Sequence, residues 1–198
     1  MDKARIILLN AIIFLPWIGV LLYYLTKNKR ARKYYRKLQE KYTFNTEEES
    51  KNKSVITGAY KNRPVKIESG TLNGQKKVNT LLTVQCENPD NFEFKLIKRN
   101  KANNSVYSKG DYMLEDNEFD DIFIIQTNNP EKLKRLFDFN TRFKLQQIIG
   151  LGFAGEISLH GNSFIYTEQG LVKNDTELMK LELVLHELCD LADVMKYN

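Results

Sequence analysis

The 198-residue sequence has few of the residues from which disulfide frameworks and common catalytic centres are built. Its two cysteines, Cys86 and Cys189, are far apart and do not form the spacing pattern of a disulfide-stapled domain. We expect both thiols to be reduced and largely buried. Only two histidines are present, no serine lies in a nucleophile elbow, and no Walker-type phosphate loop occurs. The sequence therefore offers no standard signature of an enzyme.

Two short motifs partly match cofactor or metal signatures. Gly150, Gly152 and Gly155 have the spacing GxGxxG, but they follow an expected helix and precede an expected strand, which reverses the order of a dinucleotide site. The segment HELCD, which begins at His186, has an aspartate where a zinc-protease helix needs its second histidine. His186 and Cys189 alone supply too few ligands for structural zinc. We expect no cofactor.

One long hydrophobic run stands near the N-terminus. Residues 6–25 carry no charge and, as a helix rising 1.5 Å per residue, would span about 30 Å, the thickness of a bilayer core. A cleaved signal peptide would have a shorter core and small residues at a cleavage site. Two basic residues precede the run and seven follow it, which places the following side in the cytoplasm. We therefore predict a transmembrane anchor over residues 1–26 of a single-pass cell-membrane protein, with its N-terminus outside and its C-terminal domain cytoplasmic.

Residues 27–53 are predicted to form a basic juxtamembrane helix followed by a polar linker. Tyr34, Leu38 and Tyr42 recur at helical spacing and mark one apolar stripe. The basic residues either contact anionic lipid headgroups, at about 1 kcal/mol each, or only fix the topology. Residues 43–53 have no apolar periodicity, so we expect a flexible linker. The candidate membrane-surface residues are Lys27, Lys29, Arg30, Arg32, Lys33, Arg36 and Lys37.

The net charge of +5 is unevenly distributed. Residues 1–42 hold ten Lys or Arg against two acids, whereas the remaining chain holds 20 against 23. The chain is basic because of its N-terminal segment, and the rest is mildly acidic. A nucleic-acid-binding domain would carry a basic surface, so we expect no nucleic-acid partner.

Residues 54–198 are predicted to form one separable α+β domain, an antiparallel sheet with helices on one face and a long C-terminal helix. Short alternating runs bounded by turn residues indicate strands, and a change to helical spacing follows Asn129-Pro130. The expected strands are 54–60, 64–68, 76–86, 92–98, 119–126, 156–160 and 163–168.

The C-terminal helix is predicted to begin at Asp175. Its apolar residues recur every three or four positions, and such a stripe ordinarily packs on the domain's own core. The alternative is a partner or self-association seam, because the same spacing suits a coiled coil. The stripe consists of Leu178, Leu181, Leu185, Leu188, Ala192 and Met195.

Residues 111–121 hold six acids. Their spacing does not fit the calcium-loop template, so a solvated acidic loop is expected. The alternative is a calcium or magnesium site that uses Asp111, Asp120 or Asp121, since such cations prefer oxygen ligands.

Several short motifs resemble a group of uncharacterised prokaryotic single-pass membrane-anchored proteins. They are VITGAYKNRPV at residues 55–65, Gly110-Asp111, FDDIF at residues 119–123, and Asn129-Pro130-Glu131. The resemblance, a G-D…F-D-x-x-F α+β domain, implies a shared fold and transfers no site residues. Phe119 and Phe123, expected on one face of a strand, are predicted to anchor the core.

These patterns favour a membrane-anchored cytoplasmic interaction or accessory module, with the lipid bilayer and a membrane-proximal protein as partners. One alternative is a membrane-associated enzyme that uses the acids of segment 111–121, which would then have to converge in a cleft. Another is a lipid-sensing module, which would contain an apolar pocket.

Overall fold

The computed structural model describes residues 15–17, 29–49, 53–71, 78–99 and 111–197. Its centre is a nine-stranded sheet in which every neighbouring pair is antiparallel, in the order β1-β2-β3-β4-β9-β8-β5-β7-β6. The strands are β1 (Asn45–Glu49), β2 (Lys53–Tyr60), β3 (Arg63–Thr71), β4 (Val78–Gln85), β5 (Phe94–Lys98), β6 (Asp111–Tyr112), β7 (Phe123–Thr127), β8 (Glu156–His160) and β9 (Ser163–Gln169). The helices are α2 (Asn117–Ile122), α3 (Pro130–Leu136), α4 (Phe139–Gly150), α5 (Asp175–Tyr197) and an N-terminal helix over residues 29–42, called the basic helix below.

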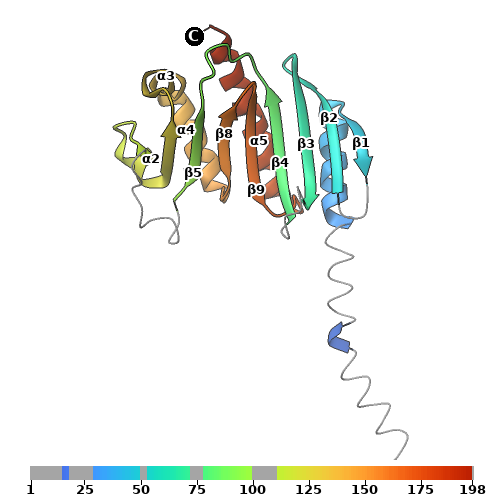
Figure 1. The fold of residues 1–198 in the computed structure, drawn as a ribbon. Coiled ribbons are helices and arrows are strands. Elements are labelled where there is room, and N and C mark those ends of the chain that lie inside the picture. The colour runs from blue at the N-terminus through green and yellow to red at the C-terminus, as the bar shows by residue number, and fades with distance from the viewer. Residues whose placement is uncertain (1–14, 18–28, 50–52, 72–77, 100–110, 198) are drawn as a thin grey trace, which may run out of the picture.

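The basic helix, α4 and α5 lie on the same face of the sheet (Figure 1). Buried and partly exposed residues alternate along the strands, because successive side chains point to opposite faces of the sheet and the helices cover one of them. Leu82 and Val84 of β4 are buried, as are Phe164 and Tyr166 of β9, while the residues between them are partly exposed. The predicted α+β class with an antiparallel sheet and a long C-terminal helix is confirmed.

The leucine stripe of α5 faces the core, as the spacing predicts. Leu181, Leu185, Leu188 and Ala192 are at most 1% exposed, and Met195 is also buried. Leu178 packs at the edge of the same cluster. The stripe is therefore part of the domain interior and does not form the alternative association seam.

The basic helix is also part of this core. Ala31, Tyr35 and Leu38 are buried in it, and the Tyr35 and Thr80 hydroxyls form a hydrogen bond of 3.1 Å. Of the predicted apolar stripe of this helix, Leu38 is buried against the sheet, whereas Tyr34 and Tyr42 are only partly buried.

The segment expected to be a flexible linker contains strand β1. Residues 45–49 pair with β2, because an edge strand needs only backbone hydrogen bonds and tolerates polar side chains. Phe44, just before β1, is buried and stacks on Tyr42 at 5.5 Å between ring centroids. Gly58 makes room for it, since a Cβ there would lie 2.2 Å from a Phe44 ring carbon.

The predicted single-pass membrane location is not upheld. Among the described residues, no helix has both the length and the apolar character needed to cross a bilayer. Helix α5, with 23 residues, is long enough, but acids and lysines occur along its length. Of the apolar run 6–25, the structure describes residues 15–17 and the rest lies outside the described residues.

The predicted strand over 119–126 is partly wrong, because its first half is helical. Asp116 caps α2 by accepting a hydrogen bond from the Phe119 amide, and acids fill the first turn, where they favour a helix. Only residues 123–127 form a strand, β7. Phe119 and Phe123 nevertheless anchor the core as predicted, with ring centroids 4.6 Å apart.

Candidate functional site

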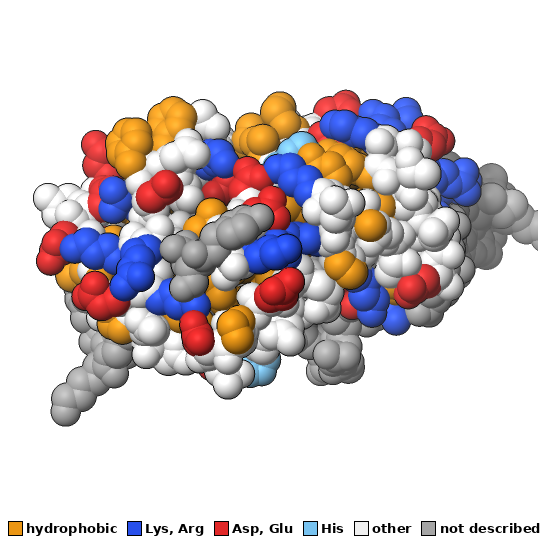
Figure 2. Space-filling view, turned by 90° about the horizontal axis from the view of Figure 1, so that it is seen from above, with side chains coloured by type: hydrophobic (Ala, Val, Ile, Leu, Met, Phe, Trp, Pro, Cys, Tyr) orange, Lys and Arg blue, Asp and Glu red, His pale blue; other side chains and the backbone are white. Residues whose placement is uncertain are grey.

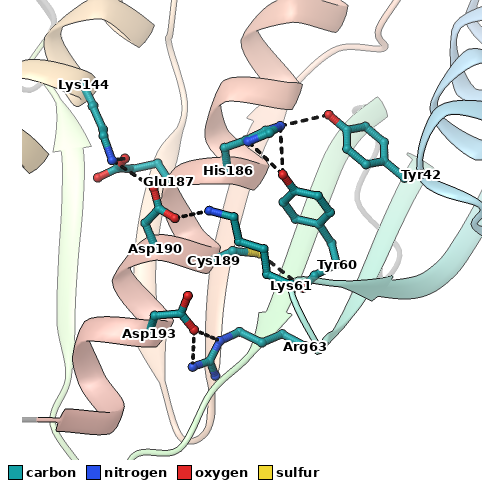
Figure 3. Close-up of polar contacts among 10 residues, drawn as sticks. All are labelled: Tyr42, Tyr60, Lys61, Arg63, Lys144, His186, Glu187, Cys189, Asp190 and Asp193. Carbon is teal, nitrogen blue, oxygen red and sulfur yellow. Dashed lines mark hydrogen bonds and ion pairs between the residues drawn. The ribbon is translucent and has the colours of Figure 1, made fainter.

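One side of α5 carries polar residues that join it to three other elements (Figure 3). Because residues three or four apart share a helix face, His186, Glu187, Asp190 and Asp193 form a row beside the buried leucines. Their partners come from the basic helix, the β2–β3 hairpin and α4. We call this row and its partners the α5 polar row.

The β2–β3 hairpin turns in two residues directly over α5. Lys61 and Asn62 have φ values of 50° and 61°, the left-handed conformation required by a tight hairpin turn. This turn places Tyr60, Lys61 and Arg63 on α5. Arg63 donates to Asp193 Oδ1 through Nε at 2.9 Å and Nη2 at 2.8 Å, and Nη2 also donates to the Ala192 carbonyl.

His186 lies between two tyrosines. Its Nε2 is 3.1 Å from the Tyr42 hydroxyl and its Nδ1 is 3.0 Å from the Tyr60 hydroxyl. The three rings pack edge to face, with centroids 5.0 to 6.1 Å apart. Burial lowers the pKa of His186, and the charges of Lys61 and Lys41 lower it further. The imidazole is therefore neutral at pH 7.

Lys144 of α4 bridges two acids of α5. Its Nζ is 3.2 Å from Glu187 Oε2 and 2.9 Å from Asp190 Oδ2, while Asp190 also pairs with Lys61. Burial raises the pKa of Glu187, and Lys144 opposes the rise. Glu187 Oε1 is buried and has no hydrogen-bond partner. An unpartnered buried oxygen of this kind costs about 1–3 kcal/mol.

A groove of about 360 Å³ runs between α4 and α5 beside this bridge. Its apolar walls are Ile148, Met179 and Leu183, and Glu187 is one of its lining residues. The remaining polar lining residues are Lys144, Gln147, Glu182, His186 and Asp190. The groove thus combines apolar walls with a buried carboxylate.

Cys189 fits a packing role. The thiol is buried beside the Tyr60 carbonyl, with Sγ 3.9 Å from the oxygen, and burial raises its pKa to about 12. Cys86 is likewise a free, buried thiol, and burial raises its pKa to about 11. Both thiols are therefore protonated and weakly nucleophilic at neutral pH.

The predicted membrane-surface residues lie on the basic helix, apart from Lys27, which is outside the described residues. Lys29, Arg30, Lys33 and Arg36 are exposed on the side away from the buried Ala31, Tyr35 and Leu38. Arg32 is partly buried, and Lys37 is exposed and pairs with Asp175 at 2.8 Å. A shallow hollow of about 480 Å³ is lined by Lys29, Arg32, Lys33, Arg36, Lys37 and Glu40.

The structure does not bring Asp111, Asp120 and Asp121 together as a site. Asp120 is buried, and its carboxylate accepts hydrogen bonds from the Leu114 amide at 3.0 Å and the Asp116 amide at 3.1 Å. Asp121 is exposed, and Asp111 lies in β6. Within the described ranges, no three His, Cys, Asp or Glu side chains are placed to share a metal ion.

The sequence reasoning missed the α5 polar row. The helical spacing of Glu187, Asp190 and Asp193 indicated a charged face next to the leucine stripe. It gave no information about Tyr60, Arg63 and Lys144, because these partners are brought close only by the tertiary fold.

The architecture defines an α+β protein whose antiparallel sheet is covered by helices on one face. No protein-family model and no curated protein matches the chain. Among solved structures, it is similar to the crystal structure of the mycobacterial trehalose monomycolate transport factor A, TtfA, with a TM-score of 0.56 and 14% sequence identity. The match covers 83% of this chain and 93% of that one. At this identity the likeness shows a shared fold.

Proposed function

We propose that this chain is a non-enzymatic accessory module for a membrane-proximal partner, and that its basic helix contacts anionic lipid headgroups. The observation that carries the proposal is the two-sidedness of this helix. Ala31, Tyr35 and Leu38 fix it to the sheet, and its exposed side presents Lys and Arg side chains. The cations thus belong to a rigid surface of the domain.

The attraction to an anionic membrane increases with the number of basic side chains that approach it together. Each Lys or Arg near an anionic bilayer contributes about 1 kcal/mol, and the attraction falls off within a Debye length of about 8 Å at physiological salt. The hollow of about 480 Å³ brings together five Lys or Arg side chains, of which Lys37 also pairs with Asp175. The name of TtfA, a transport factor, supports an accessory role, and a lipid-linked process is consistent with it.

Vesicle co-sedimentation of the full chain tests the proposal. Vesicles of phosphatidylcholine alone are compared with vesicles that contain a third phosphatidylglycerol, at low and high salt. The test variant carries Lys29→Gln, Arg30→Gln, Lys33→Gln and Arg36→Gln. The control carries Lys134→Gln, Arg135→Gln, Lys173→Gln and Lys196→Gln, which remove the same charge from exposed positions elsewhere.

We expect the wild-type chain and the control to bind anionic vesicles more strongly than neutral ones, with the excess lost at high salt. The test variant should lose at least about tenfold of this excess, since four contacts are removed. Equal binding of the test and control variants would refute the lipid contact.

A further inference from the structure

The basic helix, α4 and α5 turn their exposed sides in one direction. All three lie on the same face of the sheet, and each packs a buried side into the common core (Figure 1). On α5, for example, Met179 and Leu183 are exposed on the side opposite the buried Leu185. In Figure 2 the helix-covered side forms the upper rim, where hydrophobic and charged side chains alternate. The outward sides of the three helices thus form one surface, called the helix face below.

The helix face exposes large apolar side chains. Phe139 and Phe143 of α4 are 76% and 50% exposed, and their rings stack with centroids 6.5 Å apart. Met179 and Leu183 of α5 are 48% and 36% exposed. Of the large exposed apolar side chains in the described residues from 29 onward, all but Met113 lie on α4 and α5. Gathered apolar side chains of this kind mark a surface that contacts another molecule or a membrane.

The acids beside these apolar side chains are neutralised within the fold. Glu182 pairs with Lys41 at 2.8 Å, and Asp190 pairs with Lys144 at 2.9 Å and also with Lys61. The basic helix, in contrast, carries more cations than acids on its outward side. The helix face therefore combines apolar side chains with a surplus of positive charge.

From this arrangement we propose that the helix face is the membrane-contacting side of the protein, and that Phe139, Phe143 and Met179 insert between the lipids of an anionic bilayer. The inference rests on the proposed lipid contact of the basic helix and adds a hydrophobic contribution from α4 and α5. Surface helices bind membranes through buried apolar area together with attraction to anionic lipids, and this face supplies both. A bilayer is also broad enough to contact three neighbouring helices at once, and its negative surface complements the surplus cations.

Site-specific fluorescence tests the insertion directly. Cys86 and Cys189 are buried, so a thiol introduced at the surface of the full chain is labelled selectively with the environment-sensitive dye NBD. The dye is attached to Phe143→Cys and, as a control, to Gln126→Cys, because Gln126 is exposed on the other face of the sheet. The vesicles contain phosphatidylcholine and a third phosphatidylglycerol. We expect the emission at position 143 to shift to the blue and to be quenched by nitroxide-labelled acyl chains, and the emission at position 126 to stay unchanged.

Co-sedimentation measures how much the apolar side chains contribute. The variant that combines Phe139→Gln, Phe143→Gln and Met179→Gln removes apolar surface and leaves the charge of the chain unchanged. We expect it to bind phosphatidylcholine vesicles at least about tenfold more weakly than the wild-type chain, since burial of apolar surface drives binding to a neutral bilayer. High salt should not abolish this difference, because salt screens only the electrostatic attraction. The three residues are exposed, so the variant should melt like the wild-type chain.

Several outcomes would overturn the inference. These are an unchanged emission at position 143, the same response from both labelled positions, or equal binding of the triple variant and the wild-type chain to neutral vesicles. A dimer in size-exclusion chromatography that the triple variant dissociates would show that a second copy covers the apolar side chains. The two proposals fail separately. Salt-sensitive binding without a blue shift would refute insertion alone, whereas a blue shift without preference for anionic vesicles would refute headgroup contact alone.

Discussion

Tyr35 and Thr80 are 45 residues apart in the chain, yet their hydroxyls lie 3.1 Å apart in the buried interior. This hydrogen bond joins the basic helix to β4 in the middle of the sheet. Burial raises the pKa of Tyr35, so its hydroxyl stays protonated. The contact shows that the sequence before residue 54 contributes to the core.

The first prediction concerns the packing of the basic helix. Leu38 has no exposed surface, so Leu38→Ala should lower the free energy of unfolding by about 2–5 kcal/mol through lost burial and a cavity. Arg36→Ala, on the exposed side of the same helix, should change it by no more than about 0.5 kcal/mol. Urea unfolding of the full chain measures both. Equal effects would show that the helix is not packed on the sheet.

The second prediction concerns the domain boundary. A fragment of residues 54–198 lacks Tyr35, Leu38, Phe44 and strand β1, so it exposes apolar surface of the sheet and leaves β2 as an unpaired edge. We expect it to aggregate or to melt broadly, whereas residues 29–198 should melt cooperatively. Circular dichroism and light scattering make the comparison. An equally sharp melt at the same temperature for both fragments would support a separable domain from residue 54.

The third prediction concerns the acidic segment. Asp120→Asn replaces a carboxylate that accepts from two backbone amides, and should cost about 1–3 kcal/mol because one amide loses its acceptor. Asp121→Asn changes an exposed neighbour and should cost less than about 0.5 kcal/mol. Chemical unfolding of both variants tests this structural role. The prediction fails if Asp121→Asn is the more damaging change.

The fourth prediction concerns pH. The pKa of His186 is lowered in the folded protein by burial and then by Lys61 and Lys41, while Asp190 and Glu182 act in the opposite direction. Below its ordinary pKa of 6.5, the unfolded chain therefore binds a proton that the folded chain does not. The stability contributed at this site is complete above about pH 6.5 and decreases as the pH falls toward the lowered folded value.

This dependence should be smaller in His186→Gln. His160 is exposed, with 77% of its side chain accessible, and His160→Gln serves as the control for the loss of an imidazole outside this site. Thermal melts between pH 5 and pH 8 record the difference. A profile that is the same for the wild-type chain and His186→Gln would show that His186 does not titrate on unfolding.

The sequence alone was sufficient to predict secondary structure where a residue pattern is repeated along one helix or strand. The leucine spacing of α5 determined both the helix and its buried side, because helical geometry fixes which residues share a face. Turn residues likewise located the β8–β9 hairpin around Gly161, where φ is 53°. The spacing of Tyr34, Leu38 and Tyr42 also predicted the basic helix, although only Leu38 of these three is fully buried.

The tertiary structure decided what depends on partners distant in the chain. β1 is polar and has no apolar periodicity, so only its pairing with β2 reveals it as a strand. Half of an expected strand is α2, where Phe119 is buried near Phe137, although its cap at Asp116 is a local signal that the strand prediction overlooked. The unpartnered Glu187 oxygen and the groove beside it arise where α4 packs on α5. Hydrogen-bond satisfaction and side-chain packing are properties of the assembled fold, and no local pattern encodes them.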